Sequence, residues 1–88
     1  MGAQSISVTV RFFASLREAT GTEALELSLA GGHLSALREA LIERLGVEAC
    51  EPLWAENVRV AVNQSIVPGA PSFAHGDEVA FLPPVTGG

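Results

Sequence analysis

The sequence contains no lysine and only one cysteine, and each shortage excludes a kind of chemistry. Cys50 has no second thiol with which to form a disulfide, a CxxC redox pair or a cysteine-rich metal site. We interpret Cys50 as a small buried apolar residue, as most free cysteines are. Without a lysine, the chain cannot carry an isopeptide on a lysine of its own. An amine joined to its terminal carboxyl group would belong to another molecule or to its own N-terminus.

Long hydrophobic runs and a secretory signal are also missing. No apolar run approaches the ~20 residues that span a bilayer, and residues 1–5 have neither the basic start nor the apolar stretch of a signal peptide. We therefore expect a soluble protein in the cytoplasm with no membrane partner. Apolar residues make up 48% of the chain and charged ones 17%, which excludes disorder. Its 88 residues suffice for one domain with one core.

The charge balance is acidic, with a net charge of −5, and all five cations are arginines. Nucleic-acid binding depends on neutralising phosphates, so we expect no nucleic-acid partner. The net charge alone favours a protein partner with a basic surface.

The motifs of self-contained catalysis are absent. The chain has no GxGxxG, no phosphate-binding loop, no HExxH and no GxSxG. His33 and His75 have no metal-ligand spacing around them, and Asp77 and Glu78 are adjacent, so they face opposite ways on a strand. We predict no resident metal or bound cofactor, and a chain that is not catalytic alone.

Two stretches near the start alternate as half-buried strands do. In residues 6–13 one face holds Ile6, Val8, Val10 and Phe12, and the other holds Ser7, Thr9, Arg11 and Phe13. Residues 14–21 break the alternation and predict a short helical turn or loop ending on Gly21. Residues 23–29 resume it with three leucines on one face, so the two strands are expected to form a hairpin.

Residues 33–45 predict one amphipathic helix, because Leu34, Leu37, Leu41 and Leu45 fall in one narrow stripe at helical spacing. Gly46 stands where a left-handed residue commonly follows a helix. The start of the helix is poorly marked, since His33 is not a favoured N-cap.

The second half of the chain is predicted to form a connector over residues 50–57, followed by further strands. Leu53 and Trp54 of the connector are expected to cover one end of the core. Three alternating valines in 58–62 predict a strand, and Asn63-Gln64 predicts a turn into a short strand.

Gly76 and Asp77 predict a turn before a last strand, on which Val79 and Phe81 point inward. Two strands, one main helix and two or three further strands indicate an α+β domain over residues 1–82, with the helix packed on one side of the sheet.

Residues 83–88 form a separate C-terminal tail in this interpretation. Pro83 and Pro84 lack an N–H and have a fixed φ, so the sheet must stop there and the chain leaves extended. Val85 and Thr86 keep it extended. Gly87 and Gly88 present backbone and a carboxylate without side chains, a shape suited to a narrow channel in another protein.

Gly88 is the expected site of chemistry. Its carboxylate is ionised at pH 7 and is a poor acyl donor, so another enzyme must activate it, for example by transfer of adenylate from ATP.

The alternation of inward and outward side chains along the strands places apolar residues beside the tail. Phe13 and Leu82 belong to the outward face of the sheet, and Ile66 joins them if the short strand pairs as expected. An exposed apolar patch of this kind is typical of a docking surface.

Three stretches together resemble the small subunit of molybdopterin synthase, a sulfur carrier with the ubiquitin-like β-grasp fold: "VRFFASLREATG", "VAVNQ" and "GDEVAFLPPVTGG". The resemblance covers nearly the whole chain and implies a mixed sheet of four to five strands on one main helix.

It further implies that an activating enzyme adenylates Gly88 with ATP and that the glycine becomes a thiocarboxylate. The tail then enters the large catalytic subunit and donates sulfur to a cyclic pyranopterin precursor. The chain departs from the family pattern at Leu82, where an aromatic residue is common, and at His33, which replaces a hydroxyl-bearing cap.

Other functions share parts of this pattern. A β-grasp sulfur carrier for thiamin or cysteine synthesis would use the same tail chemistry. A ubiquitin-like modifier would end in an amide between Gly88 and a lysine of a target. A plain interaction module would not need Gly87 and Gly88 at all.

Overall fold

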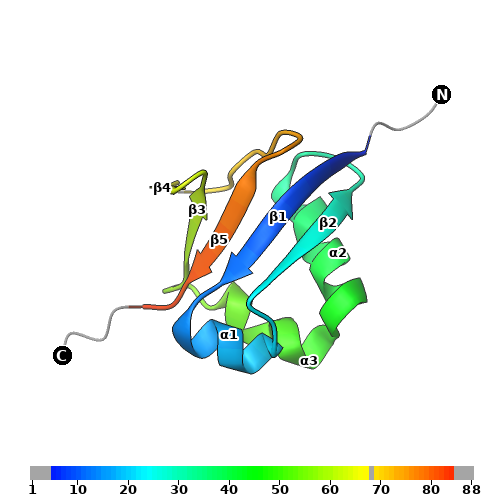
Figure 1. Cartoon of the computed structure of the whole chain (residues 1–88). Helices are drawn as coiled ribbons and strands as arrows, with labels where there is room; N and C mark the ends of the chain where they lie inside the picture. Colours follow the sequence, from blue (N-terminus) through cyan, green and yellow to red (C-terminus); the bar gives the residue numbers. More distant parts are fainter. Residues whose placement is uncertain (1–4, 68, 85–88) are drawn as a thin grey trace.

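The structure is a computed structural model of the chain, and it describes residues 5–67 and 69–84. It is a mixed sheet covered by helices on one face (Figure 1). The elements are β1 (Ile6–Phe12), α1 (Ala14–Thr20), β2 (Ala24–Leu29), α2 (Leu34–Leu45), α3 (Val47–Cys50), the 3-10 helix η1 (Glu51–Trp54), β3 (Arg59–Val62), β4 (Ser65–Ile66) and β5 (Glu78–Leu82).

The five strands lie in the order β2-β1-β5-β3-β4. β1 pairs with β2 in antiparallel register from Ile6 opposite Leu29, which confirms the predicted pairing, although α1 occupies the connection. β1 also pairs with β5, and these two strands run parallel. The first and last strands of the chain therefore lie side by side at the centre of the sheet.

The alternation predicted for the strands is confirmed by burial. The inward residues of the sheet and the helical stripe of α2 form one core, which includes Val8, Val10, Phe12, Leu27, Leu29, Leu37, Leu41, Val79 and Phe81. The rings of Phe12 and Phe81 stack with centroids 5.8 Å apart, an arrangement that stabilises by about 0.5–1.5 kcal/mol beyond the buried area. The core thus joins the two central strands through side chains as well as backbone.

The structure contains two short helices that the sequence did not indicate: α3, which ends where the predicted connector begins, and η1 within the connector. Leu53 is buried and Trp54 is half-buried. The Trp54 ring meets Phe81 edge-on at 6.2 Å between centroids, so both residues cover one end of the core as predicted. The Arg38 guanidinium lies over the Trp54 ring, 4.7 Å from its centroid.

The two ends of α2 differ from the sequence-based expectation. His33 acts as the N-cap, because its Nδ1 accepts a hydrogen bond of 3.2 Å from the Ala36 N–H. An imidazole nitrogen thus replaces the usual hydroxyl or carboxylate oxygen. Gly46 has φ 99° and ψ 155°, so it is not left-handed helical. It instead extends the chain directly into α3, a conformation that glycine tolerates because it has no Cβ.

Gly32 marks the closest approach of two backbones. Its carbonyl oxygen accepts a 2.7 Å hydrogen bond from the N–H of Phe73, a buried residue. A Cβ at Gly32 would overlap the Phe73 carbonyl oxygen. The long loop between β4 and β5 is therefore held against the start of α2 by a contact that only glycine allows.

Gly32→Ala is predicted to destabilise the fold by about 1–3 kcal/mol, since backbone rather than a movable side chain must shift. Urea unfolding measures this change. Gly31→Ala is the matched control, because the nearest atoms to its Cβ belong to the His33 side chain rather than to backbone, so its cost is limited to a shift of this ring and of the cap that it provides. Equal losses in the two variants would contradict the close approach at Gly32.

Candidate functional site

The three residues predicted to form a docking surface lie together on the outward face of the sheet. We call Phe13, Ile66 and Leu82 the docking patch. Phe13 follows β1 and is 38% exposed, Ile66 belongs to β4 and is 60% exposed, and Leu82 ends β5 and is partly buried. All three line one open groove of about 370 Å³. Its floor includes the small side chains of Ala61 and Ala80, which face each other across β3 and β5.

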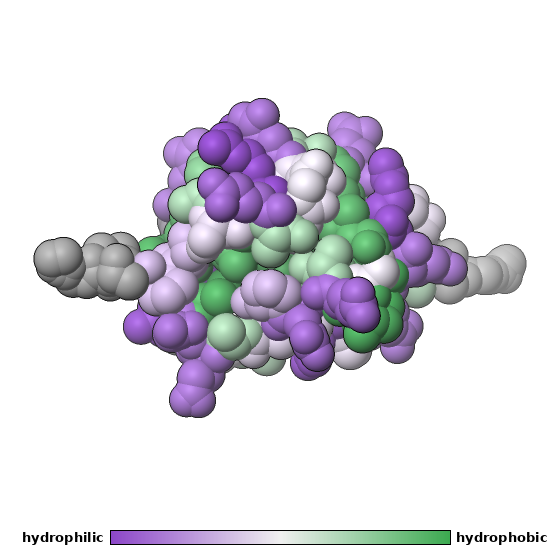
Figure 2. Space-filling model, turned by 90° about the horizontal axis from the view of Figure 1, so that it is seen from below, coloured by the Kyte–Doolittle hydropathy of each residue, from purple (hydrophilic) through white to green (hydrophobic). Residues whose placement is uncertain are grey.

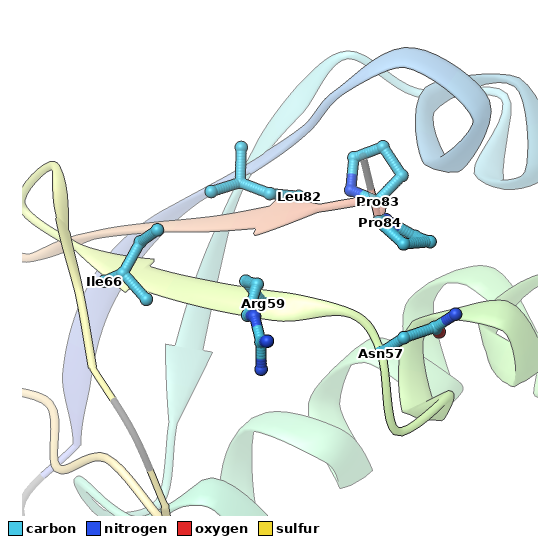
Figure 3. Close-up of a pocket in the computed structure, with 6 residues that line it drawn as sticks. All are labelled: Asn57, Arg59, Ile66, Leu82, Pro83 and Pro84. Atoms are coloured by element: carbon cyan, nitrogen blue, oxygen red, sulfur yellow. The ribbon is translucent and has the colours of Figure 1, made fainter. Parts of the chain in front are cut away.

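A second groove of about 670 Å³ adjoins the first and shares Ile66 and Leu82 with it. Its other lining residues are Asn57, Arg59, Pro83 and Pro84. In Figure 3 the Arg59 side chain, from β3, lies between Ile66 and the two prolines that follow β5. The docking patch therefore continues without a break to the root of the tail.

The tail itself is described only at its root. β5 ends at Leu82, and Pro83 and Pro84 follow it outside the sheet. The predicted tail residues Val85, Thr86, Gly87 and Gly88 lie outside the described residues. Figure 2 views the end of the molecule at which β1 and β5 terminate, and hydrophobic residues reach the surface there between hydrophilic ones.

The grooves also include residues that the sequence did not single out as part of a docking surface: Arg11, Asn57, Arg59, Ala61, Gln64, Glu78 and Ala80. All except Asn57 and Gln64 alternate with inward residues of their own strands. Strand alternation was therefore a sufficient signal to place these five on the outward face. Asn57 lies in the loop before β3 and Gln64 in the turn after it, where no periodicity applies.

Arg11 is fully engaged within the chain. Its Nη1 lies 3.4 Å from Glu78 Oε2, an ion pair whose two side chains are 40% and 31% exposed. Its guanidinium also lies over the Phe13 ring, 5.5 Å from the centroid. Such exposed contacts contribute little stability, and they place Arg11 against both Glu78 and the Phe13 ring.

A bracket of hydrogen bonds fixes the hairpin that presents Ile66. Asn63 and Gln64 form the two-residue turn between β3 and β4, both at positive φ. The Asn63 side chain donates to Asp77 Oδ1 at 3.0 Å and accepts from the Glu78 N–H at 3.0 Å. Asp77 Oδ2 accepts from the Ala74 N–H at 2.8 Å. The β3–β4 hairpin is thus tied to the turn before β5.

The other candidate groups are not placed for chemistry. Cys50 is buried in the core, and burial raises the pKa of its thiol, so little reactive thiolate forms near neutral pH. His33 and His75 each act as a hydrogen-bond acceptor for a backbone N–H. Within residues 5–67 and 69–84, no three His, Cys, Asp or Glu side chains are grouped as metal ligands. In the same part of the chain, no helix is long and apolar enough to cross a membrane.

Comparison with known proteins gives the family. The ThiS family matches residues 10–88. The chain belongs to the ThiS family. It is 38% identical to the molybdopterin synthase sulfur carrier subunit of Haemophilus influenzae, over 92% of this chain and 99% of that one. The subunit of the same name from Escherichia coli is also 38% identical, with the same coverage. The family inferred from the sequence is therefore confirmed.

Solved structures give the fold of this ThiS-family chain. SAMP1 from Haloferax volcanii has a TM-score of 0.75 at 24% identity, covering 93% of this chain and 99% of that one. Subunits 1 and 2 of molybdopterin-converting factor from Helicobacter pylori form a complex whose matching chain has a TM-score of 0.66 at 27% identity, covering 94% of this chain and 100% of that one. The predicted α+β, ubiquitin-like β-grasp fold is confirmed.

The Asp77 bracket predicts a pH-dependent stability. The Ala74 backbone N–H, and then the Asn63 side chain, lower the pKa of the Asp77 carboxyl group. The stabilisation is therefore complete above the unfolded pKa of about 3.9 and is lost as the pH falls through the lower folded value. Asp77→Asn should lower the melting temperature at pH 7, and the difference from wild type should begin to shrink as the pH falls below about 4 and vanish below the lower folded pKa.

Glu56→Gln is the control for loss of one negative charge, because Glu56 is exposed and has no side-chain hydrogen bond among the described residues. A constant difference between Asp77→Asn and wild type from pH 7 to pH 3 would show that the ionised bracket does not stabilise the hairpin.

Proposed function

We propose that the chain is the sulfur carrier subunit of molybdopterin synthase. The observation that supports this function most directly is the continuity of the docking patch with the root of the tail. A partner that covers Ile66 and Leu82 also reaches Pro83 and Pro84, which line the same groove. It would therefore receive whatever follows the prolines. The two ThiS-family relatives named above, at 38% identity, support the choice of pathway.

The chemistry requires only a reachable terminal carboxylate from this chain. An activating enzyme transfers adenylate from ATP to the Gly88 carboxylate, with release of pyrophosphate. A sulfur donor at the level of hydrosulfide then displaces AMP and leaves a thiocarboxylate. In the synthase, this thiocarboxylate donates its sulfur to a cyclic pyranopterin precursor. The chain is the sulfur-donating subunit, and it needs no bound cofactor of its own.

Each part of the chain has a role in this proposal. Residues 83–87 insert into the large catalytic subunit, and the docking patch binds its surface. The second partner is the activating enzyme. Support for a large-subunit partner comes from the Helicobacter pylori structure, whose name describes a complex of subunits 1 and 2. The expected setting is the cytoplasm.

A second candidate function is protein modification. A structural neighbour from Haloferax volcanii is named a small archaeal modifier protein, and this name is the reason for considering protein modification. A modifier would leave Gly-Gly remnants on target lysines after proteolysis. Sulfur carriage for another pathway shares the tail chemistry, and it is separated from the leading function by the need for a stable complex with the large synthase subunit.

Deletion of Gly88 is predicted to abolish molybdopterin formation. The wild-type chain, first loaded with sulfur, is mixed with the large subunit and the pyranopterin precursor, and molybdopterin is measured. The deleted chain cannot form the same terminal thiocarboxylate in the same place, although its core is unaltered. Equal melting temperatures of the two chains establish that folding is not the cause. Full activity of the deletion variant would contradict the role of Gly88.

Ile66→Asp is predicted to weaken binding of the large subunit by at least about 2 kcal/mol, roughly 30-fold in Kd, because the interface would bury an unpaired carboxylate. Isothermal titration calorimetry measures this change. Val47→Asp is the matched control, because Val47 is 62% exposed against 60% for Ile66 and lies on α3 outside both grooves. Similar affinities of the two variants for the large subunit would show that the docking patch is not part of the interface.

A further inference from the structure

Charge is distributed unevenly between the two grooves and the rest of the chain. The grooves are lined by Arg11, Arg59 and Glu78 as their only charged residues, so their lining has a net charge of +1. The whole chain has a net charge of −5, which leaves −6 for the remaining residues. The face next to the tail is therefore locally positive on an acidic protein.

The positive charge of this face is concentrated at Arg59. Arg11 is neutralised by Glu78, which is the one ion pair formed by described residues. Arg59 is exposed on β3, and no carboxylate of residues 5–67 or 69–84 lies within ion-pair distance of it. In the β3–β5 register, Arg59 stands directly opposite Leu82. Arg59, which has no ion-pair partner among the described residues, is therefore the cross-strand neighbour of an apolar residue of the docking patch.

A partner that fills the groove lined by Ile66 and Leu82 also contacts Arg59, which lines the same groove. The residues Ile66, Leu82, Pro83 and Pro84 line the same groove as Arg59, and in Figure 3 the Arg59 side chain extends from β3 with its guanidinium pointing away from Leu82. Docking removes water from the guanidinium, and a desolvated charge without a counter-charge opposes binding. A carboxylate is the group that best matches its planar, forked donors.

We infer that the partner receiving the tail presents a carboxylate to Arg59, beside the opening through which residues 83–88 pass. The partner's docking surface would then be apolar opposite Ile66 and Leu82, and acidic opposite Arg59. This inference rests on the proposed function for the identity of the partner, the large subunit of molybdopterin synthase. It goes further by assigning Arg59 a role in selecting that partner.

The inference changes the expectation based on net charge. An average of −5 favours a basic partner, but charges interact mainly within a Debye length of about 8–10 Å. Among the described residues that line the two grooves, the one charge outside an ion pair is the positive charge of Arg59. A competing surface with lysine or arginine at that point would be rejected by like-charge repulsion, even though the chain as a whole is acidic.

Charge reversal at Arg59 tests the inference. The full-length chain and its Arg59→Glu variant are titrated with the large subunit in low salt and again in high salt. We expect Arg59→Glu to bind roughly 30- to 100-fold more weakly in low salt, because it places two carboxylates together. The gap should narrow in high salt, where exposed charges are screened. Arg59→Lys should retain most of the affinity.

Arg44→Glu is the matched control, because it changes the net charge equally at an exposed position of α2 outside both grooves. Its affinity should stay within about 3-fold of wild type, since the charge lies away from the interface. Melting temperatures of both variants establish that each is folded. An Arg59→Glu affinity equal to that of Arg44→Glu in low salt would overturn the inference.

A reciprocal variant identifies the carboxylate. Each aspartate and glutamate around the opening of the large subunit is replaced by arginine and titrated with Arg59→Glu. One replacement should restore binding, and failure of every replacement would overturn the inference.

The outcomes separate this inference from the proposed function. If Ile66→Asp weakens binding while Arg59→Glu does not, the role of Arg59 is wrong and the sulfur-carrier function stands. If the wild-type chain itself fails to bind the large subunit, both are contradicted.

Discussion

The parallel pairing of β1 with β5 is the constraint on which the site depends. It joins residues almost seventy positions apart, from Thr9 opposite Glu78 to Phe12 opposite Phe81. The stacked rings of Phe12 and Phe81 seal this pairing from the core side. On the other side of the sheet, the next residues along the two strands are Phe13 and Leu82, both of which line the docking groove. The same pairing therefore builds the core and places an apolar surface at the root of the tail.

The sequence was sufficient to predict the features of the fold that depend on local periodicity. Alternation predicted which strand residues point inward, and by difference it predicted that Phe13, Ile66 and Leu82 point outward. It was not sufficient for what depends on long-range geometry. The hydrogen bond between Asn63 and Asp77 joins residues from separate turns, and the type of neither residue predicts which residue it will contact. The two grooves, likewise, exist only because strands distant in the chain are neighbours in the sheet.

Local sequence preferences did not predict how the two ends of α2 are formed. His33 caps α2 with a ring nitrogen, although histidine is not among the residues preferred at the N-cap. Gly46 has a positive φ, as expected, but its ψ of 155° sends the chain into α3 rather than into a loop. The net charge of −5 is likewise an average over the chain, and it does not indicate that Arg59, in the groove beside the docking patch, has no ion-pair partner among the described residues.

In the proposed function, the folded domain and the C-terminal tail therefore have different roles. The domain supplies a stable sheet and an oriented apolar surface, and the proposed chemistry takes place at Gly88. The most direct measurement is the intact mass of the chain after incubation with ATP, a sulfur source and the activating enzyme, beside a chain that lacks Gly88. A mass gain equal to the exchange of one oxygen for one sulfur, absent from the shortened chain, is the predicted result. No gain with an enzyme preparation that loads another sulfur carrier would contradict the account.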